Sequence, residues 1–336
     1  MNKEAYIIDG IRTPVGKFGG GLSAVRTDDL AAMVIEELVK RNPQIPTEEI
    51  DDVILGCHNQ AGEDNRNVAR MAALLAGLPV TVPGETVNRL CSSGMASIVH
   101  ANRAIKAGDG DLFIAGGVEH MTRGPLVISK PSKAFGTDSK MEDSSFGWRF
   151  VNPKMNEVYG TDPMGITAEN LVDMYQISRE DQDKFALASQ LKATKAQENG
   201  RLAEEIMDVV IPQRKGEPIV FSKDEFVRPN STIEGLQKLR PAFKKDGSVT
   251  AGNASSLNDG AAAVMLMRRE QAQALNLPIL ARVAGQGAAG VDPAIMGIGP
   301  VAATQQCLKK TGWEVADLDV IEANEAFAVQ ALAVEQ

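Results

Sequence analysis

The segment GETVNRLCSSGMASIVHANRAIKAG (residues 84–108) decides the fold class of this 336-residue chain. An extended stretch ends at Val87, a short turn carries Cys91, and a helix rich in small residues runs over Gly94–Ala107 until Gly108 ends it. Apolar runs continue to alternate with helical patterns on both sides of this segment. This alternation is typical of an α/β fold built from layers of helices and strands.

The same alternation predicts the principal elements. Apolar runs of strand length are separated by stretches whose apolar residues recur at helical spacing. The predicted strands are Ala5–Asp9, Asp52–Gly56, Gly84–Val87, Asp111–Gly116, Ala261–Met267 and Ile279–Ala284. The predicted helices are Asp28–Arg41, Asn67–Ala76, Gly94–Ala107, Ser178–Glu198, Val301–Lys310 and Ala326–Val334.

The domain organisation follows from where this pattern is interrupted. Between residues 119 and 249, Pro, Gly and Ser are scattered and strand-like runs are short, which predicts an inserted loop domain. The rest of the chain then divides around this insertion. We expect an N-terminal core half at residues 1–118, the inserted domain at 119–249, a return to the first half at 250–268 and a C-terminal core half at 269–336.

A weak internal repeat relates the two core halves. IPTEEIDDVILG (residues 45–56) resembles WEVADLDVIEAN (residues 313–324), each with a polar turn followed by an apolar run that is interpreted as a strand. The first copy continues into a further strand, the Cys91 turn and a helix, whereas the second stops at Gln336 inside its helix. Since a βαβ unit spans roughly 30 residues, we expect a shortened second half. An open sheet edge would then cause association unless a partner covers it.

Composition argues against several functional classes. Lys and Arg number 35 against 44 Asp and Glu, a net charge of −9, which is unlike a general nucleic-acid or anionic-membrane binder. No apolar run approaches the roughly 20 residues of a membrane-spanning helix. The three cysteines, Cys57, Cys91 and Cys307, cannot all pair and lack the spacing of zinc ligands. We therefore expect a cytoplasmic protein without a metal site.

Cys91 is the candidate nucleophile. A thiol between a strand and a helix N-terminus meets amide N–H groups and the positive end of the helix dipole, which stabilise a thiolate and a developing oxyanion. A cysteine nucleophile also needs a base. Among His58, His100 and His120, the position of His120 directly after a strand favours it. The alternatives, a buried structural thiol and packed or solvated imidazoles, stay open at this point.

Three further segments have the composition of a ligand site. Asn324 and Glu325 follow an apolar run at a strand-to-helix junction, where α/β folds place ligands, although Asn324 is equally suited to cap the helix. TAGNASSLNDGAAAV (residues 250–264) offers backbone N–H groups and Ser255 to a polar chain, or else is a tight connector. Residues 214–245 carry eight basic and four acidic side chains, a local balance of +4, which favours a ligand with phosphate groups unless it is a solvated face.

In combination, these segments resemble the thiolase family. NRLCSSGMASI (residues 88–98) is similar to the family's nucleophile segment, TAGNASSLNDGAAAV (residues 250–264) to its coenzyme A loop, and NEAF (residues 324–327) to its Asn-containing catalytic motif. AGGVEHM, MGITAEN, LRPAF and MGIGP also match family patterns, so the resemblance covers essentially the whole chain. QAGEDNRNVAR (residues 60–70) and GWRFVNPKM (residues 147–155) most resemble the β-ketoadipyl-CoA thiolases, with general 3-oxoacyl-CoA thiolases close behind.

The resemblance implies a fold and a reaction. The fold is a five-layered αβαβα arrangement of two similar core halves with an inserted loop domain. In the ping-pong reaction, Cys91 attacks the 3-keto carbon of a 3-oxoacyl-CoA, acetyl-CoA leaves, and free CoA takes the acyl group. The thioester intermediate splits one high barrier into two lower ones. Coenzyme A and acyl-CoA are thus implied as substrates, with no covalently bound cofactor, and the family is typically a homodimer or homotetramer.

The resemblance also assigns roles to individual residues. Asn324 would hold a water that helps to stabilise an enolate oxygen. Ser255 and Ala251 would contact the pantetheine chain, and Arg228 would lie near the adenine-nucleotide end. The side chains implied to line the pantetheine and acyl channel are Met164, Phe243 and Phe327.

Several departures from the family pattern qualify this reading. The loop has Ser256 where Gly commonly follows the first Ser, and Asp162-Pro163-Met164 replaces the His-Met typical of acetoacetyl-CoA-forming members. The family's GHP segment, which supplies the histidine that activates the nucleophile, and its CxGGGxG segment, which supplies an acid–base cysteine, are not among the 336 residues. None of the three histidines matches the first segment, and Cys307 does not match the second. We therefore expect a shortened thiolase with little or no activity, since each lost group slows the reaction by about 10²–10⁴.

Three other functions are weighed against a thiolase. A CoA-binding or oligomerising remnant without catalysis predicts CoA binding and no turnover. An acetoacetyl-CoA-forming acetyltransferase is disfavoured by Asp162-Pro163-Met164. A decarboxylating condensing enzyme requires two histidines, or a histidine and an asparagine, after the nucleophile, and neither pair stands at suitable positions.

Overall fold

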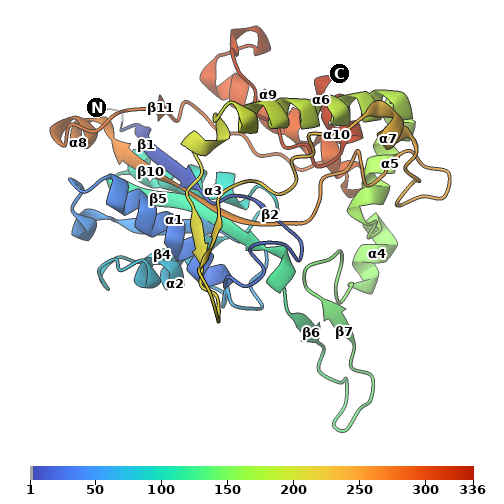
Figure 1. Cartoon of the computed structure of the whole chain (residues 1–336), viewed down its shortest axis with the longest axis horizontal. Helices are drawn as coiled ribbons and strands as arrows, with labels where there is room; N and C mark the ends of the chain where they lie inside the picture. Colours follow the sequence, from blue (N-terminus) through green and yellow to red (C-terminus); the bar gives the residue numbers. More distant parts are fainter. Residues whose placement is uncertain (1–2) are drawn as a thin grey trace. The chain divides into compact units, whose positions relative to one another are not determined.

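The computed structural model describes residues 3–336, which form two compact units (Figure 1). Each unit combines segments that are distant in the sequence. Unit 1 contains the chain up to Ser145, Gly200–Phe226 and Leu257–Val283, and unit 2 contains Phe146–Asn199, Val227–Ser256 and Ala284–Gln336. The four-part division expected from the sequence stays a prediction.

Unit 1 is built on one mixed β-sheet. Its strands are β1 (Ala5–Arg12), β2 (Gly16–Lys17), β3 (Asp52–Gly56), β4 (Gly84–Val87), β5 (Leu112–His120), β10 (Asn258–Arg268) and β11 (Ala281–Arg282). The strand order is β11-β1-β10-β5-β3-β4, and β2 pairs with β10. β3 runs parallel to β4 and β5, whereas β10 runs antiparallel to β1 and β5.

Helices cover both faces of this sheet, as the two apolar clusters show. The covering helices are α1 (Thr27–Arg41), α2 (Val68–Leu75) and α3 (Ser93–Ala107). In β3, Val53 and Leu55 face the cluster that contains α1 and α2, while Ile54 faces the cluster that contains α3. This period of two is why runs of Val, Ile and Leu form strands buried on both faces. Unit 1 therefore has three layers, with α3 on the opposite face from α1 and α2 (Figure 1).

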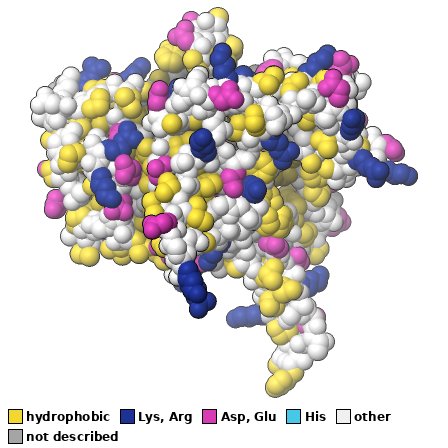
Figure 2. Space-filling view, in the orientation of Figure 1, with side chains coloured by type: hydrophobic (Ala, Val, Ile, Leu, Met, Phe, Trp, Pro, Cys, Tyr) yellow, Lys and Arg dark blue, Asp and Glu magenta, His cyan; other side chains and the backbone are white. Residues whose placement is uncertain are grey.

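Smaller elements complete unit 1. They are β6 (Leu126–Ile128), β7 (Met141–Asp143), β8 (Val209–Ile211), β9 (Ile219–Phe221) and α8 (Arg269–Ala274). β6 pairs with β7 and β8 with β9, both as antiparallel hairpins. The β6–β7 hairpin projects from the sheet and carries hydrophobic side chains at its surface (Figures 1 and 2), with Phe135 fully exposed in its loop.

Unit 2 is helical in the part of the chain that the structure describes. Its helices are α4 (Pro153–Tyr159), α5 (Met164–Tyr175), α6 (Arg179–Glu198), α7 (Ile233–Gln237), α9 (Gly299–Thr311) and α10 (Ala328–Glu335). The start predicted for α6 is confirmed, because the side chain of Ser178 accepts a hydrogen bond from the N–H of Asp181. The core of unit 2 joins α5, α10 and the segment that contains Val249, with Leu171 and Val329 fully buried.

The alternating pattern predicted most elements well. β3 and β4 have the predicted bounds, and Gly108 ends α3 in the left-handed conformation with φ of 88°. The strand predicted over Ile279–Ala284 is shorter, because only Ala281–Arg282 pairs with β1. The α/β class was therefore readable from apolar periodicity, whereas strand length was set by pairing partners.

The strand predicted immediately before Asn324 is wrong. The repeated turn does form, since Thr47–Glu49 and Val315–Asp317 are 3₁₀ turns at matching positions of the two copies. The apolar run that follows the second turn has no regular structure, and Val320 and Ile321 are 77% and 67% exposed. A strand needs a neighbour for its backbone hydrogen bonds, and no described segment of unit 2 pairs with this run.

Candidate active site

Cys91 lies in the turn between β4 and α3 in unit 1. Its side chain is exposed and stands two residues before the first residue of α3, where the helix amides and dipole favour an anion. The buried structural thiol considered from the sequence is therefore wrong for Cys91. It describes Cys57, whose Sγ donates to the carbonyl oxygen of Asn59 at 2.8 Å and whose thiol pKa is raised by burial.

Close packing of α3 on the sheet sets the position of this turn. A Cβ on Gly56 at the end of β3 would lie 2.2 Å from the carbonyl carbon of Ser93, so only glycine permits this approach. The buried hydroxyl of Ser97 donates to the carbonyl oxygen of Gly116 at 2.8 Å and accepts from the N–H of Gly116 at 2.9 Å. The first turns of α3 are thus fastened to β3 and β5.

His120, the histidine favoured from the sequence, is a packed interior residue. Its Nε2 lies 3.1 Å from the carbonyl oxygen of Leu22, and its Nδ1 lies 3.2 Å from Oδ1 of Asp259. Burial alone raises the pKa of the Asp259 carboxyl, but hydrogen bonds from His120 and Thr122 outweigh burial and hold that pKa below its ordinary value. The interpretation of His120 as a base for Cys91 is therefore wrong, because its ring is enclosed while Cys91 is exposed.

The other two histidines face carboxylates at the surface of unit 1. Nδ1 of His58 lies 3.6 Å from Glu119, and Nδ1 of His100 lies 3.6 Å from Glu85. At 3.6 Å these are ion-pair distances rather than hydrogen bonds. The described contacts of neither ring involve Cys91.

The loop predicted to bind coenzyme A is folded on itself in unit 2. Oδ1 of Asn253 accepts from the N–H of Thr250 at 2.8 Å, and Oγ1 of Thr250 accepts from the N–H of Gly252 at 3.1 Å. Thr250 and Asn253 are buried, whereas Ala251 and Ser255 are exposed. The turn therefore hides its polar supports and presents the two residues predicted to contact pantetheine.

Buried side chains of α5 and α6 support this loop. Nδ2 of Asn253 donates to Oδ1 of Asp183 at 3.0 Å, and the second oxygen of Asp183 binds Nε of Arg179 at 2.8 Å. The carboxylate of Glu169 accepts from the N–H groups of Ser248 and Val249 just before the loop, both within 2.9 Å at the nearer oxygen. Asp183 and Glu169 are almost fully buried, so each backbone or amide donor replaces lost water contacts.

The loop is joined directly to the NEAF segment. The N–H of Ser255 donates to the carbonyl oxygen of Ala326 at 2.9 Å, and the N–H of Ala328 donates to the carbonyl oxygen of Asn253 at 2.8 Å. Ala254 and Phe327 thereby form a β-bridge between segments that lie more than 70 residues apart. Two of the predicted motifs are thus brought together within unit 2.

Two of the three residues predicted to line the pantetheine and acyl channel contact each other. The rings of Phe243 and Phe327 contact edge to face, with centroids 6.1 Å apart. A Cβ on Gly165 would lie 2.1 Å from the Phe243 ring. This ring therefore packs against α5 at Gly165, the residue after Met164. Met164 and Phe243 are exposed while Phe327 is buried, which gives an apolar surface with a fixed base.

The side chains of Asn324 and Arg228 are both exposed. Asn324 is exposed and precedes α10 by four residues; Phe327 is the N-cap of that helix, so the capping role considered for Asn324 is wrong. The N–H of Arg228 donates to Oε1 of Gln190 on α6 at 2.8 Å, and its side chain is exposed. The basic stretch of residues 214–245 is divided between the units at Phe226, and its role in binding phosphate groups stays a prediction.

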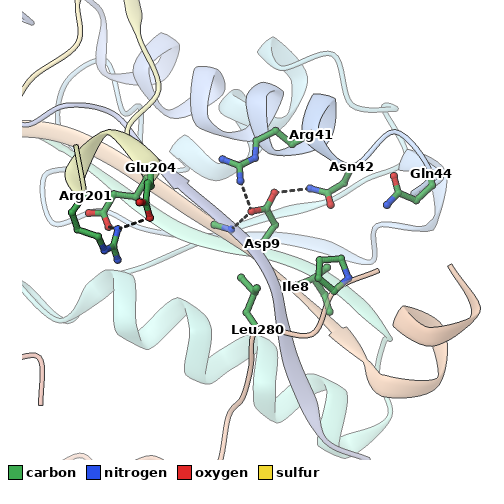
Figure 3. Close-up of a pocket in the computed structure, with 11 residues that line it drawn as sticks. Ile8, Asp9, Arg41, Asn42, Gln44, Arg201, Glu204 and Leu280 are labelled. Carbon is green, nitrogen blue, oxygen red and sulfur yellow. Dashed lines mark hydrogen bonds and ion pairs between the residues drawn. The ribbon is translucent and has the colours of Figure 1, made fainter. Parts of the chain in front are cut away.

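A cavity of about 790 Å³ in unit 1 lies elsewhere. Figure 3 shows its lining, in which the carboxylate of Asp9 accepts hydrogen bonds from Arg41 and Asn42, both at 2.9 Å. Ile8 and Leu280 contribute apolar surface. None of the residues predicted for the site from the sequence lines this cavity.

Residues 3–336 lack two structural features. No group of three or more His, Cys, Asp or Glu side chains there is arranged to hold a metal ion. No helix in that range is long and apolar enough to cross a membrane.

Sequence reasoning missed the supporting residues of both segments. Asn88 and Ser93 stand within the quoted nucleophile segment and Asn253 within the quoted loop, so their positions gave a signal that was not used. Asp183 gave a weaker signal, its spacing of four from Arg179 on a predicted helix. Its burial depends on tertiary packing and has no local signature.

Comparisons with known proteins identify the family. Residues 5–270 match the thiolase N-terminal domain, and residues 277–336 match the thiolase C-terminal domain. The chain is 56% identical over 332 residues to the 3-oxoadipyl-CoA/3-oxo-5,6-dehydrosuberyl-CoA thiolase of Escherichia coli K12, which covers 99% of this chain and 83% of the relative. It is 55% identical over 334 residues to the beta-ketoadipyl-CoA thiolase of Pseudomonas knackmussii, with the same coverage.

A solved structure agrees with this result. The acetyl-CoA acetyltransferase of Bacillus anthracis superposes with a TM-score of 0.89 at 44% identity, over 100% of this chain and 84% of that one. The chain therefore belongs to the thiolase family of acyltransferases and has the thiolase fold.

Proposed function

We propose that this chain is a thiolase that cleaves 3-oxoadipyl-CoA with coenzyme A through a thioester on Cys91. The observation that carries the proposal is an exposed Cys91 at the N-terminus of α3 in a chain 56% identical to a 3-oxoadipyl-CoA thiolase. An exposed cysteine is a strong nucleophile for acyl transfer.

The proposed chemistry proceeds in two halves. The sulfur of Cys91 bonds to the C3 carbonyl carbon, the C2–C3 bond breaks, and its electron pair passes to C2. Protonation of C2 releases acetyl-CoA, and the succinyl group stays on the sulfur as a thioester. The thiol of a free CoA then attacks this thioester, which yields succinyl-CoA and restores Cys91. Amide groups at the start of α3 would stabilise the oxyanion in each half.

Unit 2 supplies the binding surface in this proposal. Ala251 and Ser255 would contact pantetheine, because their side chains are exposed on a loop whose other polar groups are buried. Met164, Phe243 and Phe327 would line the acyl channel, a role supported by the contact between the rings of Phe243 and Phe327. Asn324 would hold the water near the enolate oxygen, and Arg228 would face the adenine nucleotide.

Acylation of Cys91 provides the test. The readout is the mass of the Cys91 peptide after incubation with 3-oxoadipyl-CoA and no free CoA. We expect one succinyl group on Cys91 and none in Cys91→Ala. Cys307→Ser is the matched control and should acylate normally.

The same experiment separates the alternatives. Acetoacetyl-CoA, offered in a second arm, should acylate Cys91 more slowly; a faster reaction would favour the acetyltransferase. Calorimetric CoA binding without any acylation of Cys91 would favour the non-catalytic remnant and would overturn the proposal. We also propose that the chain assembles into a homodimer or homotetramer in the cytoplasm. Sedimentation at several protein concentrations tests this assembly.

A further inference from the structure

Leu90, the residue before Cys91, has an unusual backbone conformation. Its φ is 48°, in the left-handed region that a leucine seldom occupies and that costs it roughly 1–2 kcal/mol. The Leu90 side chain is 63% exposed, so burial of that side chain does not enforce the conformation. Some other interaction must hold the backbone here.

Two flanking side chains bind both backbone polar groups of Leu90. Oδ1 of Asn88 accepts from the N–H of Leu90 at 2.9 Å. Oγ of Ser93 donates to the carbonyl oxygen of Leu90 at 2.6 Å and accepts from the N–H of Arg89 at 2.8 Å. Ser93 is buried, so its hydroxyl is shielded from competing water. We call Asn88 and Ser93 the turn clamp.

The turn clamp is anchored to three neighbouring strands. Nδ2 of Asn88, which directly follows β4, donates to the carbonyl oxygen of His58 at 3.1 Å. His58 lies just beyond β3, and its N–H donates to the carboxylate of Glu119 on β5 at 2.7 Å. Glu119 also accepts from the N–H of Asn59 at 3.1 Å. Because β4, β3 and β5 are adjacent in the sheet, the clamp is tied to a rigid base.

We propose that Asn88 and Ser93 are positioning residues, which hold Leu90 in the left-handed conformation and thereby fix the direction in which Cys91 presents its sulfur at the start of α3. Rotation of Leu90 to a right-handed conformation would redirect the chain at the next residue. The inference rests on the proposed role of Cys91 as the nucleophile. Neither clamp residue need touch the substrate.

The rate at which iodoacetamide alkylates Cys91 tests the clamp. The background is Cys307→Ser, and the variants are Ser93→Ala and Asn88→Asp; the second keeps the acceptor for Leu90 but removes the donor to His58. We expect each to slow alkylation about tenfold, since Ser93→Ala loses the hydrogen bond to the carbonyl oxygen of Leu90 and Asn88→Asp loses the one that ties the clamp to His58. Ser92→Ala is the matched control, because Ser92 is exposed and its side chain does not cap α3.

A rescue distinguishes positioning from general loss of structure. Glycine adopts positive φ freely, so Leu90→Gly added to Ser93→Ala should restore most of the alkylation rate. Circular dichroism and protection of the buried Cys57 thiol confirm folding in each variant. Should Ser93→Ala fail to fold, Asn88→Asp and its Leu90→Gly double variant carry the same test.

The outcomes that overturn the inference are definite. Unchanged alkylation in both clamp variants, equal slowing in Ser92→Ala, or no rescue by Leu90→Gly in a folded protein would each do so. Failure of the proposed function has a different signature. In that case the clamp variants still slow alkylation, but 3-oxoadipyl-CoA leaves Cys91 without an acyl group.

Discussion

In unit 1, the helix that follows Cys91 packs its backbone directly on a sheet, whereas in unit 2 buried ionic and amide side chains position Ala251 and Ser255. In unit 1, Gly56 lets the start of α3 contact β3 without any intervening side chain. In unit 2, the buried carboxylate of Asp183 accepts a hydrogen bond from Nδ2 of Asn253 and so holds the loop. The difference teaches that the contact of α3 with the sheet is sensitive to added volume, and the loop of unit 2 to lost hydrogen bonds.

The chain carries separate probes for the two units. Both tryptophans, Trp148 and Trp313, belong to unit 2, so their fluorescence reports on that unit. The thiol of Cys57 is buried in unit 1, so its labelling during urea unfolding reports on unit 1.

The largest effect is expected from added volume in unit 1. A Cβ on Gly116 would lie 2.1 Å from the carbonyl oxygen of Ala262, a backbone atom that cannot move aside. Gly116→Ala should therefore lower the free energy of unfolding of unit 1 by about 3 kcal/mol, seen as Cys57 labelling at lower urea. Gly94→Ala is the control, since its nearest contact would be an ordinary 3.8 Å. Equal stability of the two variants would contradict the packing argument.

A smaller effect is expected from the loop support in unit 2. Asn253→Ala removes the amide that binds Asp183 and the acceptor for the N–H of Thr250. The free energy of unfolding reported by tryptophan fluorescence should fall by about 2 kcal/mol, because a buried carboxylate loses a donor. Calorimetry should also show weaker CoA binding. Gln237→Ala, an exposed amide on α7, serves as control. Unchanged CoA affinity would show that the loop does not bind CoA.

The smallest effect concerns pH and unit 1. Burial raises the pKa of Asp52 to about 6, and its Oδ1 has no hydrogen-bond partner. Because the folded-state pKa lies above the unfolded one, the favourable contribution of the protonated form is lost as pH rises through about 6. Asp52→Asn should stabilise unit 1 by about 1 kcal/mol at pH 8 and by nothing at pH 4. A pH-independent difference in the Cys57 signal would refute this assignment.

Local patterning predicted the framework but not its supports. Val53, Ile54 and Leu55 give a strand wherever parallel neighbours pair with both edges and helices cover both faces, so β3 was predictable. Val320 and Ile321 look similar in the sequence but have no pairing neighbour, which is a tertiary property.

The candidate site divides in the same way. Cys91 and Ser255 stand in segments whose composition and order are distinctive. The left-handed Leu90 could not be anticipated, because nothing about leucine signals a positive φ. The supports became visible only once backbone angles and burial were known.

The β-bridge between Ala254 and Phe327 couples the loop to the start of α10, so that the two segments move together. Any ligand that immobilises Ser255 also restrains Ala326 through their shared hydrogen bond, and so limits fraying of the helix over residues 328–335. Thermodynamic reciprocity then requires that whatever stabilises α10 strengthens binding at the loop. Amide hydrogen exchange along α10 should therefore slow when a ligand binds at the loop, even if the ligand contacts no side chain of that helix.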